Sequence, residues 1–271
     1  MYDFPISSSS PRIPHIIHQT YTPESIPMDF QKNVQSSIRF NPNWKYMFWT
    51  DETARKFIQA MYPDSLVIWD NYRNNVNKAD ALRYFVMYEF GGIYADLDFE
   101  CIRPLDPVTR IYAAIFPLEP FEHSALRYEI PFLLHNAIMM SKPKHPFLKH
   151  MIDNLSAFQA LWEQLDVAGP CFVQRIISCH ITTSRQVTLT NSVSLLQDVN
   201  AVYIPNTHFF MNTLATIGFH ENGGIELCLI LSNDSSAILK RGCNELRRRK
   251  SPSIENFFDS RILSTIGRIH T

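Results

Sequence analysis

Two aspartates at the end of an apolar run constrain the fold and function of this chain more than any other sequence feature. The segment "GGIYADLD", residues 91–98, joins a glycine pair to a short apolar stretch that ends in Asp96 and Asp98. Side chains alternate along a strand, so both carboxylates are predicted to point to the same side. Two carboxylates this close repel each other unless a positive charge lies beside them. The segment therefore predicts a cation site at a strand end, where α/β sheets place their ligands.

Oxygen ligands of this kind suit Mg²⁺ or Mn²⁺, which keep coordination positions open for a phosphate. An EF-hand is excluded, because a calcium loop starting at Asp96 would have Ile102 in place of glycine and Pro107 in place of glutamate. An aspartyl-phosphate phosphatase site fits poorly, since Phe99 and Glu100 follow where a small hydroxyl residue is expected. A purely structural turn stays open on the motif alone.

A helix predicted over residues 77–90 brings two more charged side chains to this place. Asp80 and Arg83 are three positions apart, which puts them on one helix face near its N-terminal end. Gly91 then ends the helix, and the glycine pair turns the chain into the strand. Asp80 and Arg83 are thus predicted to meet the aspartates at the strand end. A surface ion pair is the alternative for Arg83.

Strands and helices alternate along the chain. Strands are predicted over residues 13–21 and 44–50, and helices over 27–42 and 51–61, the latter opened by an N-cap at Thr50. Further strands are predicted over 111–116, 136–141 and 199–205, with a helix over 145–158. This order predicts an α/β fold in which helices flank a central, mostly parallel sheet.

Composition and patterning set the limits of the predicted domain. Hydrophobic residues make up 45% and charged residues 19% of 271, which is enough for an ordinary globular core. Residues 1–12 are rich in serine and proline and are predicted to be disordered. Residues 13–217 are predicted to form the catalytic domain. Periodicity fades after that, so 218–271 are predicted to be a weakly structured basic tail.

Several functional classes are not supported by the chain. A net charge of −1 gives no general argument for nucleic acid as a partner. The five cysteines form no C-x-x-C pair, so a zinc knuckle or a thioredoxin-like site is not predicted. No run of about 18 apolar residues exists, and the start of the chain lacks a signal-peptide pattern. A spanning helix and a signal peptide are therefore not predicted.

The string "NKADALRYFVMYEFGGIYADLD", residues 77–98, resembles a D-x-D sugar-transferase family. The family includes the fungal initiating α-1,6-mannosyltransferases and the inositol-phosphoceramide mannosyltransferases, and more distantly the large clostridial glucosylating toxins. "IPHIIHQTY", "YMFWTDE" and "NAIMMSKPKHPF" match other parts of its pattern, so the resemblance covers residues 13–217. It implies a GT-A type nucleotide-sugar fold and a metal-dependent, retaining transfer of a hexose, with mannose as the first expectation.

The resemblance also implies roles for the residues of the central string. Asp98 would be a direct ligand of Mn²⁺ or Mg²⁺, and Asp96 would contact the ribose, the sugar or the metal through water. Asp80 and Arg83 would hold the sugar hydroxyls and the diphosphate of the donor. Tyr94 would contact phosphate or sugar, and a simple core aromatic is its equally weighted alternative.

Other parts of the matched pattern are expected to complete the donor site. His18, Gln19 and Thr20 would carry contacts to the base and ribose, although a lone His in an apolar strand is more often a core residue. Gly92 stands in register with the donor-binding residues of the string. Asn136 would lie near the donor sugar or the acceptor, with a strand-edge hydrogen bond as the alternative.

The resemblance implies a GDP-mannose or UDP-hexose donor and a glycan or inositol-phosphosphingolipid acceptor. It also implies a Golgi or secretory-membrane location, with which a peripheral membrane association is compatible. Relatives end in a histidine and a "GSW"-like lid. Here His208 or His220 would supply the histidine as a further metal ligand, but no tryptophan follows either one. A catalytically impaired nucleotide-sugar or glycan-binding protein is therefore the alternative function.

Overall fold

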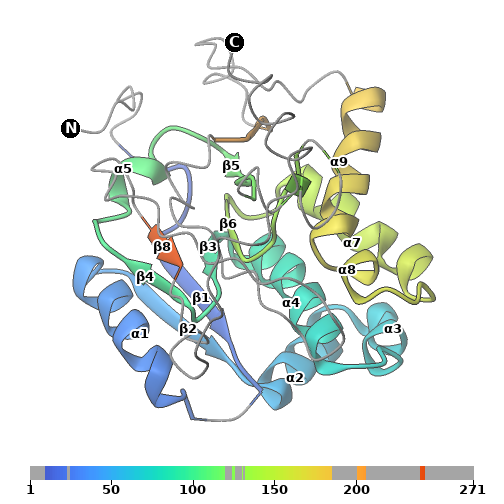
Figure 1. The fold of residues 1–271 in the computed structure, drawn as a ribbon, viewed down its shortest axis with the longest axis horizontal. Helices are drawn as coiled ribbons and strands as arrows, with labels where there is room; N and C mark the ends of the chain where they lie inside the picture. The colour runs from blue at the N-terminus through green and yellow to red at the C-terminus, as the bar shows by residue number, and fades with distance from the viewer. Residues whose placement is uncertain are drawn as a thin grey trace, which may run out of the picture.

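A six-stranded mixed sheet forms the centre of the computed structural model, with helices on both faces (Figure 1). The structure describes residues 10–22, 25–119, 124–125, 130, 132–184, 200–205 and 239–241. The sheet order is β2-β1-β3-β6-β5-β7. Its strands are β1 Ile16–Thr20, β2 Lys45–Trp49, β3 Gly92–Ala95, β5 Ala114–Ile115, β6 Ile138–Ser141 and β7 Val202–Tyr203.

The pairs β1–β2, β1–β3 and β5–β7 are parallel, whereas β6 runs antiparallel to β3 and β5. The α/β class with a mostly parallel, helix-flanked sheet is therefore confirmed, in agreement with the expected GT-A type. Strand β3 pairs in parallel with β1 on one side and antiparallel with β6 on the other. Its carboxyl end is thus a point where the topology of the sheet changes, which is where ligands bind in open α/β sheets.

Helices alternate with these strands as the sequence pattern predicts. The helical segments are α1 Met28–Phe40, α2 Asp51–Met61, η1 Pro63–Ser65, α3 Leu66–Asp70, α4 Asn75–Phe90, α5 Asp106–Thr109, α7 Pro146–Phe158, α8 Gln164–Val167 and α9 Pro170–Ser184. The predicted N-cap of α2 is present, since the Thr50 side chain accepts a hydrogen bond from the backbone N–H of Thr53. Helix α4 begins two residues earlier than predicted, because the side chain of Asn74 caps it.

Two hydrophobic clusters cover the two faces of the sheet. Helices α2, α4, α7 and α9 pack over one face, and α1, β4 (Phe99–Cys101) and α5 pack over the other. Along β3, Ile93 and Ala95 face the α1 side, whereas Tyr94 faces the α4 side. This alternation sets the direction of Asp96, the next residue on the α4 side.

The glycine pair has a steric reason. Gly91 and Gly92 have φ values of 62° and 103°, a backbone region that L side chains rarely adopt. A Cβ at Gly91 would lie 2.6 Å from the backbone nitrogen of Pro143, and one at Gly92 would lie 2.5 Å from the carbonyl oxygen of Ile16. The pair therefore allows α4 to fold back directly onto β3.

Part of the segment predicted as a weakly structured tail pairs with the domain. Strand β8, Leu239–Arg241, runs antiparallel to β4 in a separate two-stranded sheet. None of the helices in the described part of the chain is long and apolar enough to span a bilayer.

Candidate functional site

Arg83 lies between two carboxylates at the carboxyl end of β3. Its Nη1 is 2.9 Å from Asp80 Oδ1 and its Nη2 is 3.0 Å from Asp96 Oδ1. Nη1 also donates to the backbone carbonyl of Asn136 at 3.1 Å. Only 8% of Arg83 and 4% of Asp80 are exposed. The predicted meeting of helix and strand end is therefore present, and Arg83 forms a buried contact in place of a surface ion pair.

Because α4 folds back onto β3, Asp80 and Asp96 lie at the same end of the sheet. Asp80 precedes Gly91 by 11 residues, which is about 16 Å along a helix axis. Asp96 follows Gly92 by four residues, which is about 13 Å along a strand. Because helix and strand run in opposite directions from the glycine pair, both carboxylates reach the same edge of the sheet.

Asn136 and Tyr84 extend the cluster toward α9. The Asn136 side chain donates to Asp80 Oδ1 at 2.9 Å and to the Tyr84 hydroxyl at 3.2 Å. The Tyr84 hydroxyl in turn donates to the carbonyl of Ala168, directly before the turn into α9. Sequence reasoning missed Tyr84. Its spacing of four residues from Asp80, which shares a helix face, is the signal that would have found it.

Tyr94 lies beneath Arg83 and fixes Asp96. Its hydroxyl donates to Asp96 Oδ1 at 2.8 Å, and its ring centroid is 4.9 Å from the guanidinium carbon of Arg83. The ring is fully buried in the cluster on the α4 side. Tyr94 is thus both a core aromatic and a neighbour of the two charged groups.

Asp98 is placed by a turn, which corrects the argument from strand alternation. Strand β3 ends at Ala95, and the N–H of Phe99 donates to the carbonyl of Asp96 at 3.2 Å. This turn breaks the strand geometry, so alternation does not set the direction of Asp98. Asp98 is half-buried, and its Oδ1 is shielded from solvent.

Gln19 joins β1 to the same strand end. Its side-chain amide donates to the carbonyls of Ala95 at 3.1 Å and Asp96 at 3.3 Å, while its oxygen accepts from the Tyr46 hydroxyl at 2.8 Å. Thr20 donates instead to the carbonyl of Trp49 at 2.9 Å. The structure therefore brings Gln19 to the backbone of the aspartate turn, and directs the Thr20 hydroxyl toward β2.

His18 lies in the core, apart from the charged cluster formed by Asp80, Arg83 and Asp96. Its Nε2 is 2.9 Å from the carbonyl of Gly91, and its Nδ1 accepts from the indole N–H of Trp49 at 3.1 Å. These two bonds define a neutral imidazole with the proton on Nε2. Burial lowers the pKa of His18 to about 4. Gly92 contributes the close backbone approach to Ile16 already described.

The depressed pKa of His18 predicts a pH dependence of folding. The unfolded chain takes up this proton near pH 6.5 and the folded chain only near pH 4. His18 therefore adds stability above pH 6.5 that is lost as pH falls toward 4, by about 3 kcal/mol. Denaturant unfolding at several pH values should show this slope in the wild type and not in His18→Gln. His150→Gln is the control, and an identical slope in His18→Gln would contradict the assignment.

Burial and neighbouring charges set the protonation of the cluster. Burial raises the pKa of Asp80 to about 6, although Arg83 opposes this shift. Burial disfavours the charge of Arg83, but Asp96, Tyr94 and Asp80 together hold its pKa well above the ordinary value. At neutral pH the guanidinium is charged and is offset by the two carboxylates.

Two buried polar atoms next to Asp80 have no hydrogen-bond partner within the described structure. They are the hydroxyl oxygen of Tyr72 and the Nε of Arg83. Tyr72 is 6% exposed, and burial together with the charge of Asp80 raises its pKa. Buried polar groups in proteins are almost always satisfied, so these two are available to a ligand or water. Sequence reasoning missed Tyr72, which lies outside every motif quoted above.

The candidate metal ligands at the carboxyl end of β3 are the carboxylates of Asp96 and Asp98. Among the described residues, no group of three or more His, Cys, Asp or Glu side chains could hold a metal ion. Mg²⁺ needs only one or two carboxylates when phosphate oxygens and water complete its shell. The turn at the end of β3 contains two carboxylates, Asp96 and Asp98, which is the number that such a site needs. The predicted ligands His208 and His220 lie outside the described residues.

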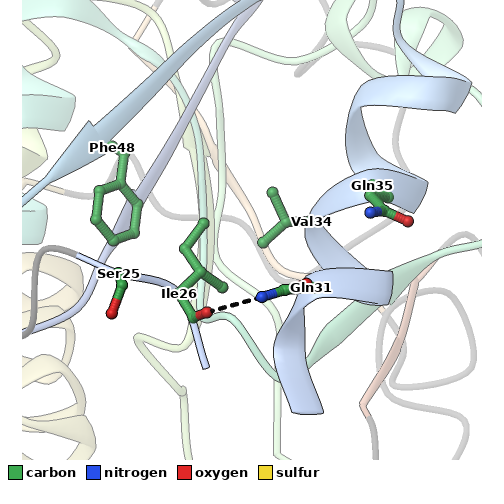
Figure 2. A pocket seen from close by; sticks show the side chains of 6 residues that line it. All are labelled: Ser25, Ile26, Gln31, Val34, Gln35 and Phe48. Atoms are coloured by element: carbon green, nitrogen blue, oxygen red, sulfur yellow. Dashed lines mark hydrogen bonds between the residues drawn. The ribbon is translucent and has the colours of Figure 1, made fainter. Parts of the chain in front are cut away.

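A pocket of about 460 Å³ lies between α1 and β2 (Figure 2). Its lining residues are Ser25, Ile26, Gln31, Val34, Gln35 and Phe48. The Gln31 side chain donates to the carbonyl of Ile26 at 3.2 Å, which closes one side. Phe48 is the strand partner of Gln19, whose amide bonds the aspartate turn. The pocket thus lies on the α1 side of the sheet, whereas Tyr94, beside the charged cluster, faces the α4 side.

The segment that contains the charged cluster is similar in sequence to known glycosyltransferases. The family described as "Glycosyltransferase sugar-binding region containing DXD motif" matches residues 27–114. Mannosyl phosphorylinositol ceramide synthase SUR1 of Saccharomyces cerevisiae is 39% identical over 150 residues, which are 55% of this chain and 36% of that protein. Inositol phosphoceramide mannosyltransferase 3 of Schizosaccharomyces pombe is 38% identical over 177 residues, 64% of this chain and 47% of that protein.

The chain thus spans less than half the length of these two relatives. Among solved structures, the PaToxG glycosyltransferase aligns with 63% of this chain and 70% of its own, at a TM-score of 0.49 and 17% identity. The predicted resemblance to the inositol-phosphoceramide mannosyltransferases is confirmed, and residues 27–114 match the model of the sugar-binding family that contains a DXD motif.

Proposed function

We propose that the chain transfers a hexose, with mannose as the first candidate, from a nucleotide-diphosphate sugar to an inositol-phosphosphingolipid or glycan acceptor. One observation carries this proposal. Arg83 is buried between Asp80 and Asp96 at the carboxyl end of β3, inside the segment that matches the sugar-binding family. The names of two similar fungal proteins supply mannose and the sphingolipid acceptor.

The chemistry requires positive charge where the diphosphate leaves. Arg83 supplies a fixed guanidinium whose Nε–H faces no protein acceptor in the described structure, and such preorganised charge stabilises a developing anion. Asp98, with Asp96, would hold Mn²⁺ or Mg²⁺. The bound metal would act as a Lewis acid on the diphosphate. Asp80 and Asn136 would accept and donate hydrogen bonds at the sugar hydroxyls.

The family resemblance implies retention of configuration at the anomeric carbon. We propose a front-face transfer in which the bond from that carbon to the diphosphate oxygen breaks. The acceptor hydroxyl oxygen bonds to the same face, and its proton passes to the departing diphosphate. Arg83 holds the leaving oxygens in place during this exchange.

Tyr72 is proposed to hydrogen-bond the donor sugar. Because its buried hydroxyl has no partner in the described structure, Tyr72→Phe should raise the KM for the donor about three- to tenfold and leave kcat within about twofold. The free energy of unfolding should stay equal or rise, since the variant removes an unsatisfied buried group. Tyr62→Phe, which removes a hydroxyl bonded to Glu89, is the control. Loss of stability without a change in KM would assign Tyr72 a structural role only.

The proposed function is tested by donor hydrolysis. The full chain is incubated with GDP-mannose, and separately with a UDP-hexose, in the presence and absence of Mn²⁺, and free sugar is measured. Slow, metal-dependent release of sugar from one donor is expected. Donor-dependent thermal stabilisation without release would instead indicate a nucleotide-sugar-binding protein. Turnover of a plain phosphate ester without need for a sugar nucleotide would indicate a phosphohydrolase.

A further inference from the structure

Exposed apolar side chains gather around the N-terminal end of α4. Trp162 is 88% exposed, Val67 68%, Val76 48% and Leu161 36%. Val67 lies on α3, Val76 in the first turn of α4, and Leu161 and Trp162 in the loop between α7 and α8. Figure 1 shows α3, α4 and α8 on the same side of the molecule. Isolated exposed apolar residues are common, but several on adjoining segments mark an interaction surface.

Specific contacts hold these segments together. The Gln159 side chain donates to the carbonyl of Ile68 at 2.9 Å, which joins the end of α7 to α3. The Asn77 side chain donates to the carbonyl of Gln164 at 3.1 Å, which joins α4 to α8. The guanidinium carbon of Arg73 lies 5.1 Å from the centroid of the Trp162 ring. We call Val67, Arg73, Val76, Leu161 and Trp162 the Trp162 patch.

We propose that the Trp162 patch binds the lipid–water interface of a bilayer. The chemistry of the patch fits this environment. An indole ring places its apolar body among the upper acyl chains and its N–H among the headgroups, which is why Trp concentrates at membrane interfaces. Arg73, stacked on the ring, lies at the level of the lipid phosphates. Val67, Val76 and Leu161 add apolar area around the ring.

The patch also lies at the edge of the sheet that holds the charged cluster. Val76 precedes Asp80 by four residues on α4, which is about 6 Å along the helix axis and away from β3. The headgroup layer on each side of a bilayer is of similar thickness, roughly 5–8 Å. A bilayer in contact with the patch would therefore present its headgroups close to the level of Asp80 along α4.

This geometry suits an acceptor whose inositol group projects from a membrane. The identity of that acceptor rests on the proposed function. The patch also supplies a membrane contact that needs no spanning helix, in keeping with the described helices. The inference deepens the proposed function by naming the surface that would present the acceptor. Membrane binding by the patch is measurable without turnover.

The test uses vesicles of phosphatidylcholine brominated on the acyl chains, which quench tryptophans that enter the bilayer. Trp49 and Trp69 are buried and Trp44 is half-buried, so Trp162 is the exposed one of the four. The wild-type chain should co-sediment with the vesicles, and its fluorescence should be quenched and shifted to shorter wavelength. Trp162→Ala should lower the partition coefficient at least about tenfold and abolish the quenching. Leu161→Ser should weaken partitioning while it keeps the fluorescent reporter.

Met28→Ala is the matched control, because Met28 is 85% exposed on α1, over the opposite face of the sheet. It should bind vesicles like the wild type. Absence of wild-type binding, equal binding by Trp162→Ala, or an equal loss in Met28→Ala would each overturn the inference. So would a dimer in analytical ultracentrifugation that Trp162→Ala dissociates without any vesicle binding, since the patch would then join two copies of the chain. Donor hydrolysis without lipid is scored separately, so failure of one proposal does not conceal failure of the other.

Discussion

Arg83→Lys is expected to lower the rate of metal-dependent donor hydrolysis at least about a hundredfold. In the arginine fork, Nη1 contacts Asp80 at 2.9 Å and the carbonyl of Asn136 at 3.1 Å, and Nη2 contacts Asp96 at 3.0 Å. A lysine keeps the charge but offers a single ammonium on a flexible stem, so it cannot reproduce this bridge. The charge would no longer be fixed where the diphosphate leaves.

The same change should destabilise the fold, because Arg83 is buried with its carboxylates. Removal of one partner of a buried ion pair costs about 3–5 kcal/mol, and the retained charge of lysine makes this an upper bound. Unfolding free energy and hydrolysis rate should be measured together, at a temperature where the variant stays folded. Arg55→Lys is the control, since Arg55 forms a two-bond ion pair with Asp70 at 2.9 and 2.7 Å on the surface. Wild-type hydrolysis by Arg83→Lys would refute the assigned role.

Asp98→Ala is expected to lower hydrolysis by about a thousandfold, the loss of several kcal/mol of charge stabilisation. The physical reason is the removal of one of the two carboxylates that we propose as ligands of the cation. The affinity for Mn²⁺ should fall as well, which titration of free Mn²⁺ by electron paramagnetic resonance measures without any turnover. Chelation of the metal in the wild type should reproduce the loss of activity.

Asp153→Ala controls for the loss of a carboxylate, because Asp153 forms a solvent-exposed ion pair with Lys149. It should hydrolyse the donor and bind Mn²⁺ like the wild type. If Asp98→Ala kept both wild-type Mn²⁺ affinity and wild-type hydrolysis, the cation site would lie elsewhere. If it lost hydrolysis alone, Asp98 would act on the donor and not on the metal.

The parts of the site that follow from local pattern were predictable from the sequence. Helix periodicity and the glycine pair placed Asp80, Arg83 and Asp96 at one edge, since helix and strand are joined directly. The start of α4 was not predicted, because the cap comes from the side chain of Asn74. Alternation failed at Asp98, because a backbone turn that begins at Asp96 ends the strand first.

Residues whose roles depend on long-range contacts could not be assigned in advance. The sequence pattern singles out neither Tyr72 nor Tyr84. The Tyr84 hydroxyl is distinguished by its bonds to Asn136 and to the carbonyl of Ala168, and the Tyr72 hydroxyl by its burial without a partner in the described structure. His18 was ambiguous between the core and the donor site, which its bonds to Gly91 and Trp49 resolve in favour of a core position. The residue type alone does not determine which polar side-chain atoms form hydrogen bonds in the folded protein.

The position of β3 between β1 and β6 has a consequence for the order of folding. Paired residues of β1 and β3 are about seventy-five positions apart, and those of β3 and β6 about forty-five, so both neighbours are non-local. Contacts between strands that are far apart in sequence form slowly relative to a helix. Asp80 and Arg83 can share a helix early, but Asp96 and Asn136 reach them only when both halves of the sheet have docked. The charges of the cluster therefore stay hydrated until late, and their desolvation accompanies completion of the native sheet.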